Sequence, residues 1–303
     1  MYRTDGERGT CVALGNFDGI HLGHRTIIEK CALTAKKEGL LSLVWSFRRH
    51  PEHILKGNFS VGNIISPQDK RELLHEIGID QVLLEDFERV RDYSPEEFCK
   101  KILLDTLSAK HVFCGFNFRF GKKGAGDADF LRKYLEPLGV KVYVEEPVSM
   151  EGDTISSSRI RAHLIQGEIQ EANRLLGRPY SIRFPVLHGK HLGTRIGFPT
   201  INQAFPEEYV IPRKGVYAVR MFFDGKFYNG VCNVGCRPTV DHDGCVLAET
   251  HLFDFSSDLY GKTVRVEFFA FLRPEQKFST LEELTEQISR DRENARSWWK
   301  EVK

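Results

Sequence analysis

The sequence is 303 residues long, which is more than one hydrophobic core usually serves, so two domains are expected. Its composition, 41% hydrophobic and 28% charged, is typical of a globular protein and excludes a disordered chain. The 43 Lys and Arg nearly balance the 42 Asp and Glu, for a net charge of +1, so the basic excess usual in proteins that bind nucleic acid is missing.

The first half of the chain alternates strand patterns with helix patterns. Five strands are expected, at 11–14, 40–47, 81–84, 111–113 and 140–144. Helical spacing covers 25–37, and further helices are predicted to begin at Ser66, at the capping box of residues 94–97 and near Asp129. This alternation predicts a Rossmann-like, doubly wound parallel sheet with helices on both faces.

The second half has the patterns of strands and turns. Four long strands are expected, at 215–223, 226–234, 246–255 and 263–272. The pair Asp224-Gly225 is a hairpin signal between the first two strands, and a long helix capped by Thr280 ends the chain. Four apolar residues mark the predicted buried stripe of that helix: Leu281, Leu284, Ile288 and Ala295. We expect a β-barrel with a terminal helix, and a boundary that divides 1–178 from 179–303.

The cysteines and the termini indicate the compartment. Seven cysteines occur without a CxxC pair: Cys11, Cys31, Cys99, Cys114, Cys232, Cys236 and Cys245. No zinc set is completed near them, and we expect most to be buried thiols in a reducing compartment. Residues 1–10 are polar, and no apolar run approaches the ~20 residues of a membrane span. A cytoplasmic protein without membrane or nucleic-acid partners is predicted.

The sequence GNFDGIHLGH, residues 15–24, lies between the first predicted strand and the first predicted helix. Ligands of a doubly wound sheet bind there, beyond the strand ends and next to helix N-termini. Its three glycines let the backbone approach an anion closely. His21 and His24 are three residues apart, so on a helical turn both could reach the same phosphate oxygens. The segment predicts phosphoryl-type transfer, in which positioning and electrostatics carry most of the catalysis.

This segment resembles the signature of the HxGH nucleotidyltransferases, and specifically the N-terminal module of bacterial bifunctional riboflavin kinase/FAD synthetases. Residues 114–121 resemble that family's GxDFxFG segment, with Asn117 where Asp is common, and residues 155–161 resemble its ISSTxIR motif. The resemblance implies that His21 and His24 are catalytic and that Asn117 binds flavin. It also implies that seven residues bind nucleotide: Gly15, Phe17, Asp18, Gly23, Ser156, Ser157 and Arg161.

Residues 189–202, GKHLGTRIGFPTIN, form the densest motif of the second half. They resemble part of the riboflavin kinase module, whose PTAN motif appears here as residues 199–202. The resemblance implies that Thr200 and Asn202 hold Mg²⁺, a hard cation that takes oxygen ligands. It further implies that three residues of the glycine-rich stretch bind ATP: Gly189, Lys190 and Gly193.

Residues 249–255, ETHLFDF, resemble the family's strand that carries a catalytic Glu. By this resemblance Glu249 is the general base. A base suits the phosphorylation of riboflavin because a hydroxyl is a poor nucleophile, whereas the phosphate of FMN is already an anion. Arg290 and Arg292, on the last predicted helix, lie in a segment that borders the flavin in relatives.

The resemblance covers nearly the whole chain and implies a bifunctional enzyme. Such an enzyme phosphorylates riboflavin to FMN with ATP and then adenylylates FMN to FAD with release of pyrophosphate. Mg²⁺ is the expected cofactor, ATP, riboflavin, FMN and FAD are the expected substrates and products, and the protein is expected to be a monomer or weak homo-oligomer. Two alternatives stay open: a riboflavin kinase whose first module is degenerate or uses another acceptor, and a flavin-binding protein without turnover.

Overall fold

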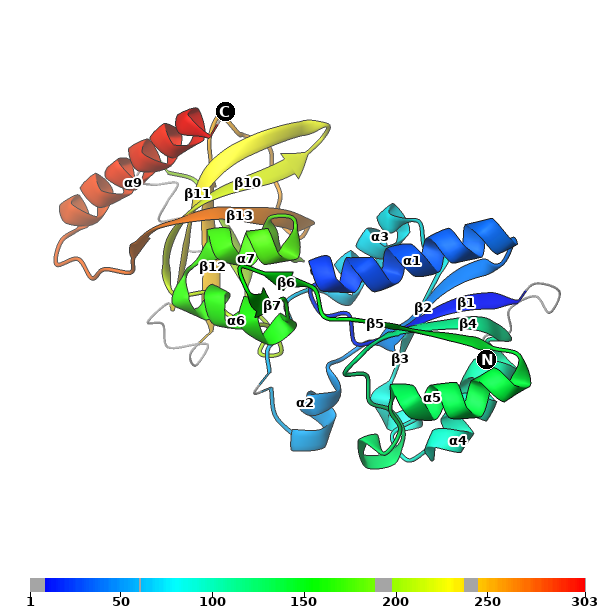
Figure 1. The fold of residues 1–303 in the computed structure, drawn as a ribbon. Helices are drawn as coiled ribbons and strands as arrows, with labels where there is room; N and C mark the ends of the chain where they lie inside the picture. The colour runs from blue at the N-terminus through cyan, green and yellow to red at the C-terminus, as the bar shows by residue number, and fades with distance from the viewer. Residues whose placement is uncertain (1–8, 60, 189–197, 237–244, 303) are drawn as a thin grey trace. The chain divides into compact units, whose positions relative to one another are not determined.

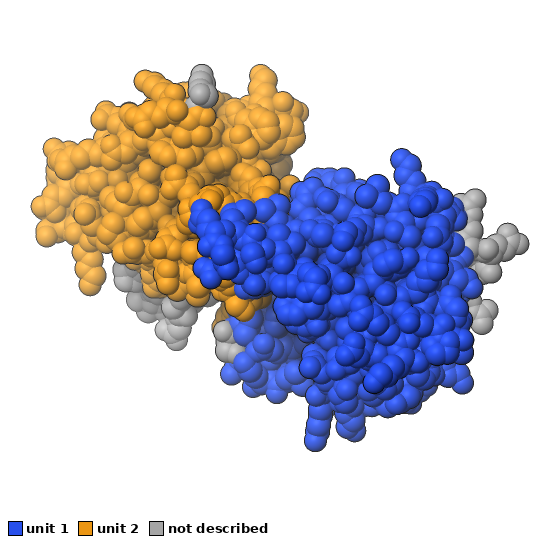
Figure 2. Space-filling model, viewed as in Figure 1, with its two compact units in different colours: residues 1–157 blue, residues 158–303 orange. Residues whose placement is uncertain are grey.

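The computed structural model describes residues 9–59, 61–188, 198–236 and 245–302. The chain forms two compact units, Met1–Ser157 and Ser158–Lys303 (Figure 2). Within the described ranges, no helix is both long enough and apolar enough to cross a membrane. The boundary between the functional modules, placed at 178/179 from the sequence, stays a prediction.

Unit 1 is built on a five-stranded parallel sheet. Its strands are β1 (Thr10–Leu14), β2 (Leu41–Phe47), β3 (Gln81–Glu85), β4 (Ala109–Gly115) and β5 (Lys141–Glu145). The strands lie in the order β3-β2-β1-β4-β5, so the direction of winding reverses between β1 and β4. A reversal of this kind opens a crevice at the carboxyl ends of the two strands. The doubly wound fold predicted from the sequence is confirmed.

Helices cover both faces of this sheet (Figure 1). The main ones are α1 (Leu22–Glu38), α3 (Pro67–Ile77), the π-helical segment η2 (Phe98–Thr106) and α5 (Ala128–Leu135). Ala13 of β1 packs with α1 and α3 in one cluster, and Leu14 packs with η2 and α5 in another. Neighbouring residues of a strand point to opposite faces, which explains why β1 is buried at every position.

Shorter segments connect these elements. They are α2 (Pro51–Lys56), η1 (Phe87–Arg89), α4 (Pro95–Glu97), η3 (Lys122–Gly124), η4 (Glu136–Leu138), β6 (Ser149–Met150) and β7 (Asp153–Thr154). The predicted helix starts are confirmed: Ser66 Oγ accepts from Asp69 N at 3.0 Å, and Ser94 forms a complete capping box with Glu97.

Unit 2 contains an antiparallel sheet of six strands, in the order β8-β13-β10-β11-β12-β9. The elements that precede and form it are α6 (Ser157–Gln166), α7 (Ile169–Leu176), β8 (Tyr180–Pro185), β9 (Ile201–Ala204), β10 (Gly215–Phe223), β11 (Lys226–Cys236), β12 (Val246–Leu252) and β13 (Thr263–Pro274). The sheet nearly closes on itself, because Leu187 N, just beyond β8, donates to Asn202 O of β9 at 2.8 Å. Gln203 of β9 also donates to Phe184 O of β8 at 2.7 Å. The predicted barrel is confirmed.

Helix α9 (Leu281–Glu301) packs against the barrel (Figure 1). Thr280 caps it, as predicted, by accepting from Glu283 N at 3.2 Å. The predicted buried stripe is correct at Ala295, which is fully buried, but wrong at Leu281, which is 49% exposed. The reason is that α9 contacts the barrel through its C-terminal half, and its first turn lies beyond that contact. Leu284 and Ile288 are half-buried.

The cysteines follow the expectation that most are buried. Five lie inside the two units, namely Cys11, Cys31, Cys99, Cys114 and Cys232, while Cys236 and Cys245 are half-buried. All seven are free thiols. Burial raises the pKa of Cys11 to about 12, so this thiol is protonated and unreactive.

Asp291 fastens α9 to the barrel. Its carboxylate is 6% exposed and accepts from Arg273 Nε at 2.7 Å, Arg273 Nη2 at 2.6 Å and Gln287 Nε2 at 2.9 Å. Because Asp291→Ala leaves the Arg273 guanidinium partly buried without this partner, we expect it to lower the free energy of unfolding by about 2–4 kcal/mol. Urea denaturation, followed by the fluorescence of Trp298 and Trp299 on α9, measures this change.

The matched control is Glu286→Gln, which removes a carboxylate from the same helix. Glu286 pairs with Arg290 at 2.8 Å, with exposed side chains on both sides, so its loss should change stability by less than about 0.5 kcal/mol. Equal destabilisation by the two substitutions would show that Asp291 does not hold the helix.

Candidate active sites

The two predicted histidines lie together at the start of α1. His21 is the N-cap residue, and its Nδ1 accepts from His24 N at 3.2 Å. The rings stack with centroids 3.6 Å apart and an interplanar angle of 19°. Because Nδ1 of His21 accepts, a neutral ring carries its proton on Nε2, where it can donate to an anion. The pair lies beyond the carboxyl end of β1, at the switch point of the sheet.

The loop that leads into this helix has a strained backbone. Phe17 has a φ of 47°, Gly19 of 83° and Ile20 of 42°. Residues other than glycine rarely adopt positive φ, and a β-branched residue such as Ile20 does so least readily. Such conformations cost about 1–3 kcal/mol each and persist only where the surroundings enforce them. Gly15 belongs to the same arrangement, because a Cβ there would lie 2.8 Å from the Phe17 ring.

Asp18 is a buried carboxylate of this loop that binds it to the backbone of residues 64–65. It is 4% exposed and accepts from Ile64 N at 3.0 Å and from Ile65 N at 3.3 Å. Its own carbonyl oxygen accepts from Ser157 Oγ at 2.8 Å. The structure thus brings the ISSS segment against the GNFDG loop. Ser156 is half-buried beside Ser157.

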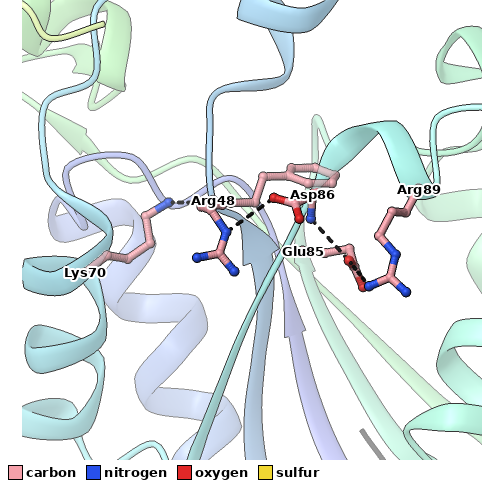
Figure 3. Close-up of polar contacts among 6 residues, drawn as sticks. Arg48, Lys70, Glu85, Asp86 and Arg89 are labelled. Carbon is pink, nitrogen blue, oxygen red and sulfur yellow. Dashed lines mark hydrogen bonds and ion pairs between the residues drawn. The ribbon is translucent and has the colours of Figure 1, made fainter. Parts of the chain in front are cut away.

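Lys70 is a buried residue that contacts the same loop, and the sequence analysis did not identify it. Its ammonium donates to Asn16 O at 2.8 Å and to Phe47 O at 3.3 Å. Figure 3 shows the Lys70 side chain with the charged residues of the same sheet edge. Lys70 is 5% exposed, and burial lowers its pKa to about 8, although the charge of Asp18 opposes this shift. The only sequence signal was its helical spacing from Leu74, which places it on the buried face of α3.

The other residues predicted for this site lie on several elements. Gly23 lies in the first turn of α1. A Cβ at this position would lie 3.3 Å from the His21 ring, which is a tight contact. Asn117 is exposed in the turn after β4, at the sheet edge where β1 also ends. Arg161 lies on α6, in unit 2, and is 9% exposed. The ligand contacts assigned to these residues stay predictions.

The second site is a row of polar residues across three neighbouring strands. Glu249 of β12 is the register partner of Asn202 on β9 and of Asn233 on β11. Residues directly opposite in antiparallel strands share a face, with Cβ atoms about 4.5–5.5 Å apart. The structure therefore brings Asn202 and Glu249 together, and Asn202 is 4% exposed. Asn233 was not predicted, because only the strand register places it there.

His251 connects this row to the PTIN segment. It lies two residues after Glu249 on the same face, and its Nδ1 contacts Pro199 O at 2.9 Å. Burial above all, together with the nearby charges of Arg292 and Arg296, lowers the pKa of His251. A neutral ring then donates from Nδ1 to the carbonyl, which fixes the backbone just before Thr200. His251 belongs to the ETHLFDF motif, but nothing in the sequence indicates that its ring contacts Pro199 O.

The aromatic neighbour of His251 also contacts a predicted flavin residue. Phe198 packs edge-on against His251, with centroids 5.6 Å apart, and the Arg292 guanidinium lies 5.2 Å from the centre of the Phe198 ring. Arg290 instead forms an exposed ion pair with Glu286. Three predicted ATP-binding residues, Gly189, Lys190 and Gly193, lie outside the described residues.

Comparison with known proteins gives a match for each part of the chain. Residues 4–159 match the family described as FAD synthetase, and residues 176–299 match the family described as riboflavin kinase. Curated bifunctional riboflavin kinase/FMN adenylyltransferases are similar over nearly the full length. The Bacillus subtilis protein is 36% identical over 94% of this chain and 90% of its own. The Pseudomonas fluorescens protein is 37% identical, over 96% and 93%.

The Escherichia coli K12 enzyme of the same name is 35% identical, over 97% of this chain and 94% of its own. Among solved structures, one described as the macrolide-efflux protein from Streptococcus pneumoniae is 31% identical, with a TM-score of 0.85. The two structures align over 96% of this chain and 95% of the Streptococcus pneumoniae chain. This likeness concerns the fold, and the efflux function is named for that protein alone.

Asp18→Asn tests whether the buried carboxylate holds the loop. The amide keeps one acceptor oxygen but presents an NH₂ group where the second carboxylate oxygen accepts from Ile64 N at 3.1 Å. We expect the local opening free energy to fall by about 1–3 kcal/mol, so that amide hydrogen exchange of residues 62–66 speeds up roughly ten-fold or more. Exchange detected by mass spectrometry on that peptide measures the effect.

Asp86→Asn is the control, because it removes an exposed carboxylate at the same edge of the sheet. The Asp86 side chain is 55% exposed and pairs with Arg48 at 3.3 Å, and its loss should leave exchange at residues 62–66 unchanged. Unchanged exchange in Asp18→Asn as well would contradict the role given to Asp18.

Proposed function

Because the chain belongs to the family of bifunctional riboflavin kinase/FMN adenylyltransferases, we propose that residues 15–24 form its adenylylation site and that the row Asn202–Glu249 belongs to its kinase site. The protein phosphorylates riboflavin to FMN with ATP and adenylylates FMN to FAD, releasing pyrophosphate. The observations that support this proposal are the contact of Ser157 Oγ with Asp18 O, which joins two motifs of the first site, and the register of Glu249 with Asn202, which joins two motifs of the second.

In the adenylylation step, a phosphate oxygen of FMN attacks the α-phosphorus of ATP. The bond from that phosphorus to the bridging oxygen of pyrophosphate breaks, and pyrophosphate leaves with the electron pair. The nucleophile is already an anion, so the site needs charge stabilisation and not a base. His21 and His24 supply donors to the phosphate oxygens, aided by the N-terminus of α1.

The other residues of the first site shape the nucleotide pocket. Phe17 and Asp18 are almost fully buried, so they act by fixing the loop whose backbone approaches the nucleotide at Gly15 and Gly23. Three further residues complete the proposed nucleotide contacts, namely Ser156, Ser157 and Arg161. Asn117, exposed at the carboxyl edge of β4, is proposed to contact the flavin.

In the kinase step, Glu249 accepts the proton of the riboflavin hydroxyl as its oxygen attacks the γ-phosphorus of ATP, and ADP leaves. Thr200 and Asn202 are two residues apart, and Asn202 is the register partner of Glu249. Their side-chain oxygens fit Mg²⁺, which takes few protein ligands beside substrate phosphates. When bound, the cation neutralises charge on those phosphates. Gly189, Lys190 and Gly193 are proposed ATP contacts, and Arg292 and Arg290 are proposed flavin contacts.

Matches to both enzyme families favour the bifunctional reading over a protein that is a riboflavin kinase alone. We further propose that the protein works in the cytoplasm as a monomer or weak homo-oligomer, without membrane or nucleic-acid partners. The net charge of +1 supports the last point.

His24→Ala tests the first site. We expect FAD formation from FMN and ATP to fall by roughly 10²-fold or more, because one donor to the developing charge is lost. Phosphorylation of riboflavin should continue, so that FMN accumulates. Chromatographic separation of the three flavins after incubation with riboflavin, ATP and Mg²⁺ gives both rates from one sample, and loss of both activities would contradict separate sites.

Glu249→Gln tests the second site. The amide keeps the size of the side chain but cannot accept the hydroxyl proton, so FMN formation should fall by roughly 10²- to 10⁴-fold. Added FMN should still be converted to FAD at the parent rate, which serves as the internal control for folding. Normal FMN formation by this variant would exclude Glu249 as the base.

A further inference from the structure

Lys70 ties together the ends of two strands at the first site. Beside its bonds to Asn16 O at 2.8 Å and Phe47 O at 3.3 Å, its ammonium lies 3.4 Å from Ser46 Oγ. Ser46 Oγ in turn donates to Asn16 O at 2.9 Å. Phe47 ends β2, and Asn16 opens the strained loop after β1. The three N–H groups of the ammonium thus match three oxygens, of which Asn16 O lies in the 15–20 loop and Ser46 Oγ donates to it.

The three N–H groups of the Lys70 ammonium are all directed to oxygens of the protein, so none is left for a substrate. Lys70 is 5% exposed, and Ser46, one of its partners, is fully buried. Any influence on the reaction therefore passes through the loop and so through the histidines at its end. The other cations at this edge of the sheet are exposed, unlike Lys70. Arg48 pairs with Asp86, and Arg89 pairs with Glu85 (Figure 3).

We propose that Lys70 is a positioning residue for adenylyl transfer, whose protonated ammonium holds the 15–20 loop and thereby His21 and His24 in the productive arrangement. This rests on the proposed function of residues 15–24. A neutral amine has two N–H groups and a lone pair, so one of the three oxygens would face a lone pair in place of a donor. Loss of the proton at Lys70 therefore loosens the loop.

The charged group that acts on Lys70 is Asp18, from the loop between β1 and α1. On its own helix, Asp69 is a buried carboxylate that accepts from Ser66 Oγ at 2.8 Å. The guanidinium of Arg48, next to Phe47, is directed to Asp86. Asp18 favours the protonated lysine, but its effect is smaller than that of burial, so the pKa of Lys70 stays near 8.

This proton has opposite effects on activity and on stability. Between about pH 8 and the ordinary lysine value of 10.5, the unfolded chain keeps the proton that the folded chain has lost. The contribution of Lys70 to the free energy of unfolding therefore rises with pH over this window. Adenylyl transfer, in contrast, should fall as the pH rises through about 8. A purely structural lysine would not give this contrast.

The test is the pH profile of FAD formation from FMN and ATP, for the full chain and its variants, between about pH 6.5 and 9.5. We expect the parent rate to fall above about pH 8. Lys70→Met should lower the rate below pH 8 roughly 10- to 100-fold and abolish the alkaline decline. Lys70→Arg, whose guanidinium stays protonated, should retain more activity than Lys70→Met and lack the decline near pH 8.

Riboflavin kinase activity of the same samples monitors folding of the chain, and thermal unfolding monitors unit 1. Arg89→Gln is the matched control, because it removes an exposed cation from the same sheet edge and should keep the parent profile. A Lys70→Met variant with the parent rate, or with the alkaline decline intact, would overturn the proposal, as would equal loss of kinase activity. If the parent chain made no FAD at any pH, the proposed function itself would fail, and this inference with it.

Discussion

The first site depends on a backbone that does not hold its shape by itself. Phe17 and Ile20 have positive φ, a conformation that costs free energy for any residue except glycine. Three groups supply the compensation: the Asp18 carboxylate on Ile64 and Ile65, the Ser157 hydroxyl on Asp18 O, and the Lys70 ammonium on Asn16 O. Asp18 belongs to the loop itself, and its partners and the other two groups come from residues 64–70 and from Ser157, both distant from the loop in the sequence. The loop can therefore form only when unit 1 has folded around it, and the fold of the sheet is the precondition for the histidine pair.

The second site obtains its geometry from strand register instead. Asn202, Glu249 and Asn233 lie side by side because β9, β12 and β11 pair without a slip, and a shift by one residue would turn Glu249 to the other face. Within the described residues of these three strands, no residue other than glycine has a positive φ. The bond of His251 with Pro199 O adds the connection that register alone does not give, since Pro199 and Thr200 precede β9. The first site is thus assembled by side-chain hydrogen bonds to a loop, and the second by the pairing of strands in a sheet.

Local patterns predicted much of this arrangement, and non-local contacts account for what they missed. Strand alternation, the caps at Ser66 and Ser94 and the spacing of His21 from His24 are properties of adjacent residues, and the structure bears them out. Lys70 and Asn233 could not be identified, because their partners are set by helix packing and by cross-strand register. Leu281 was expected to be buried from its spacing alone, but burial depends on where the barrel ends beneath α9. The spacing of apolar residues identifies which face of a helix is apolar, but it does not show how much of that face packs against the rest of the protein.

The two sites are equipped for nucleophiles of opposite kinds. Riboflavin offers a neutral hydroxyl, which suits the carboxylate proposed as its base, Glu249, between the amides of Asn202 and Asn233. FMN offers a phosphate, which a carboxylate beside it would repel. Asp18, in the loop of the proposed adenylylation site, is buried and directed to backbone N–H groups. Its negative charge also interacts with the ammonium of Lys70. On the proposed assignment of the two sites, the phosphate added in the kinase step makes a base unnecessary in the adenylylation step, and this links the chemistry of the two reactions.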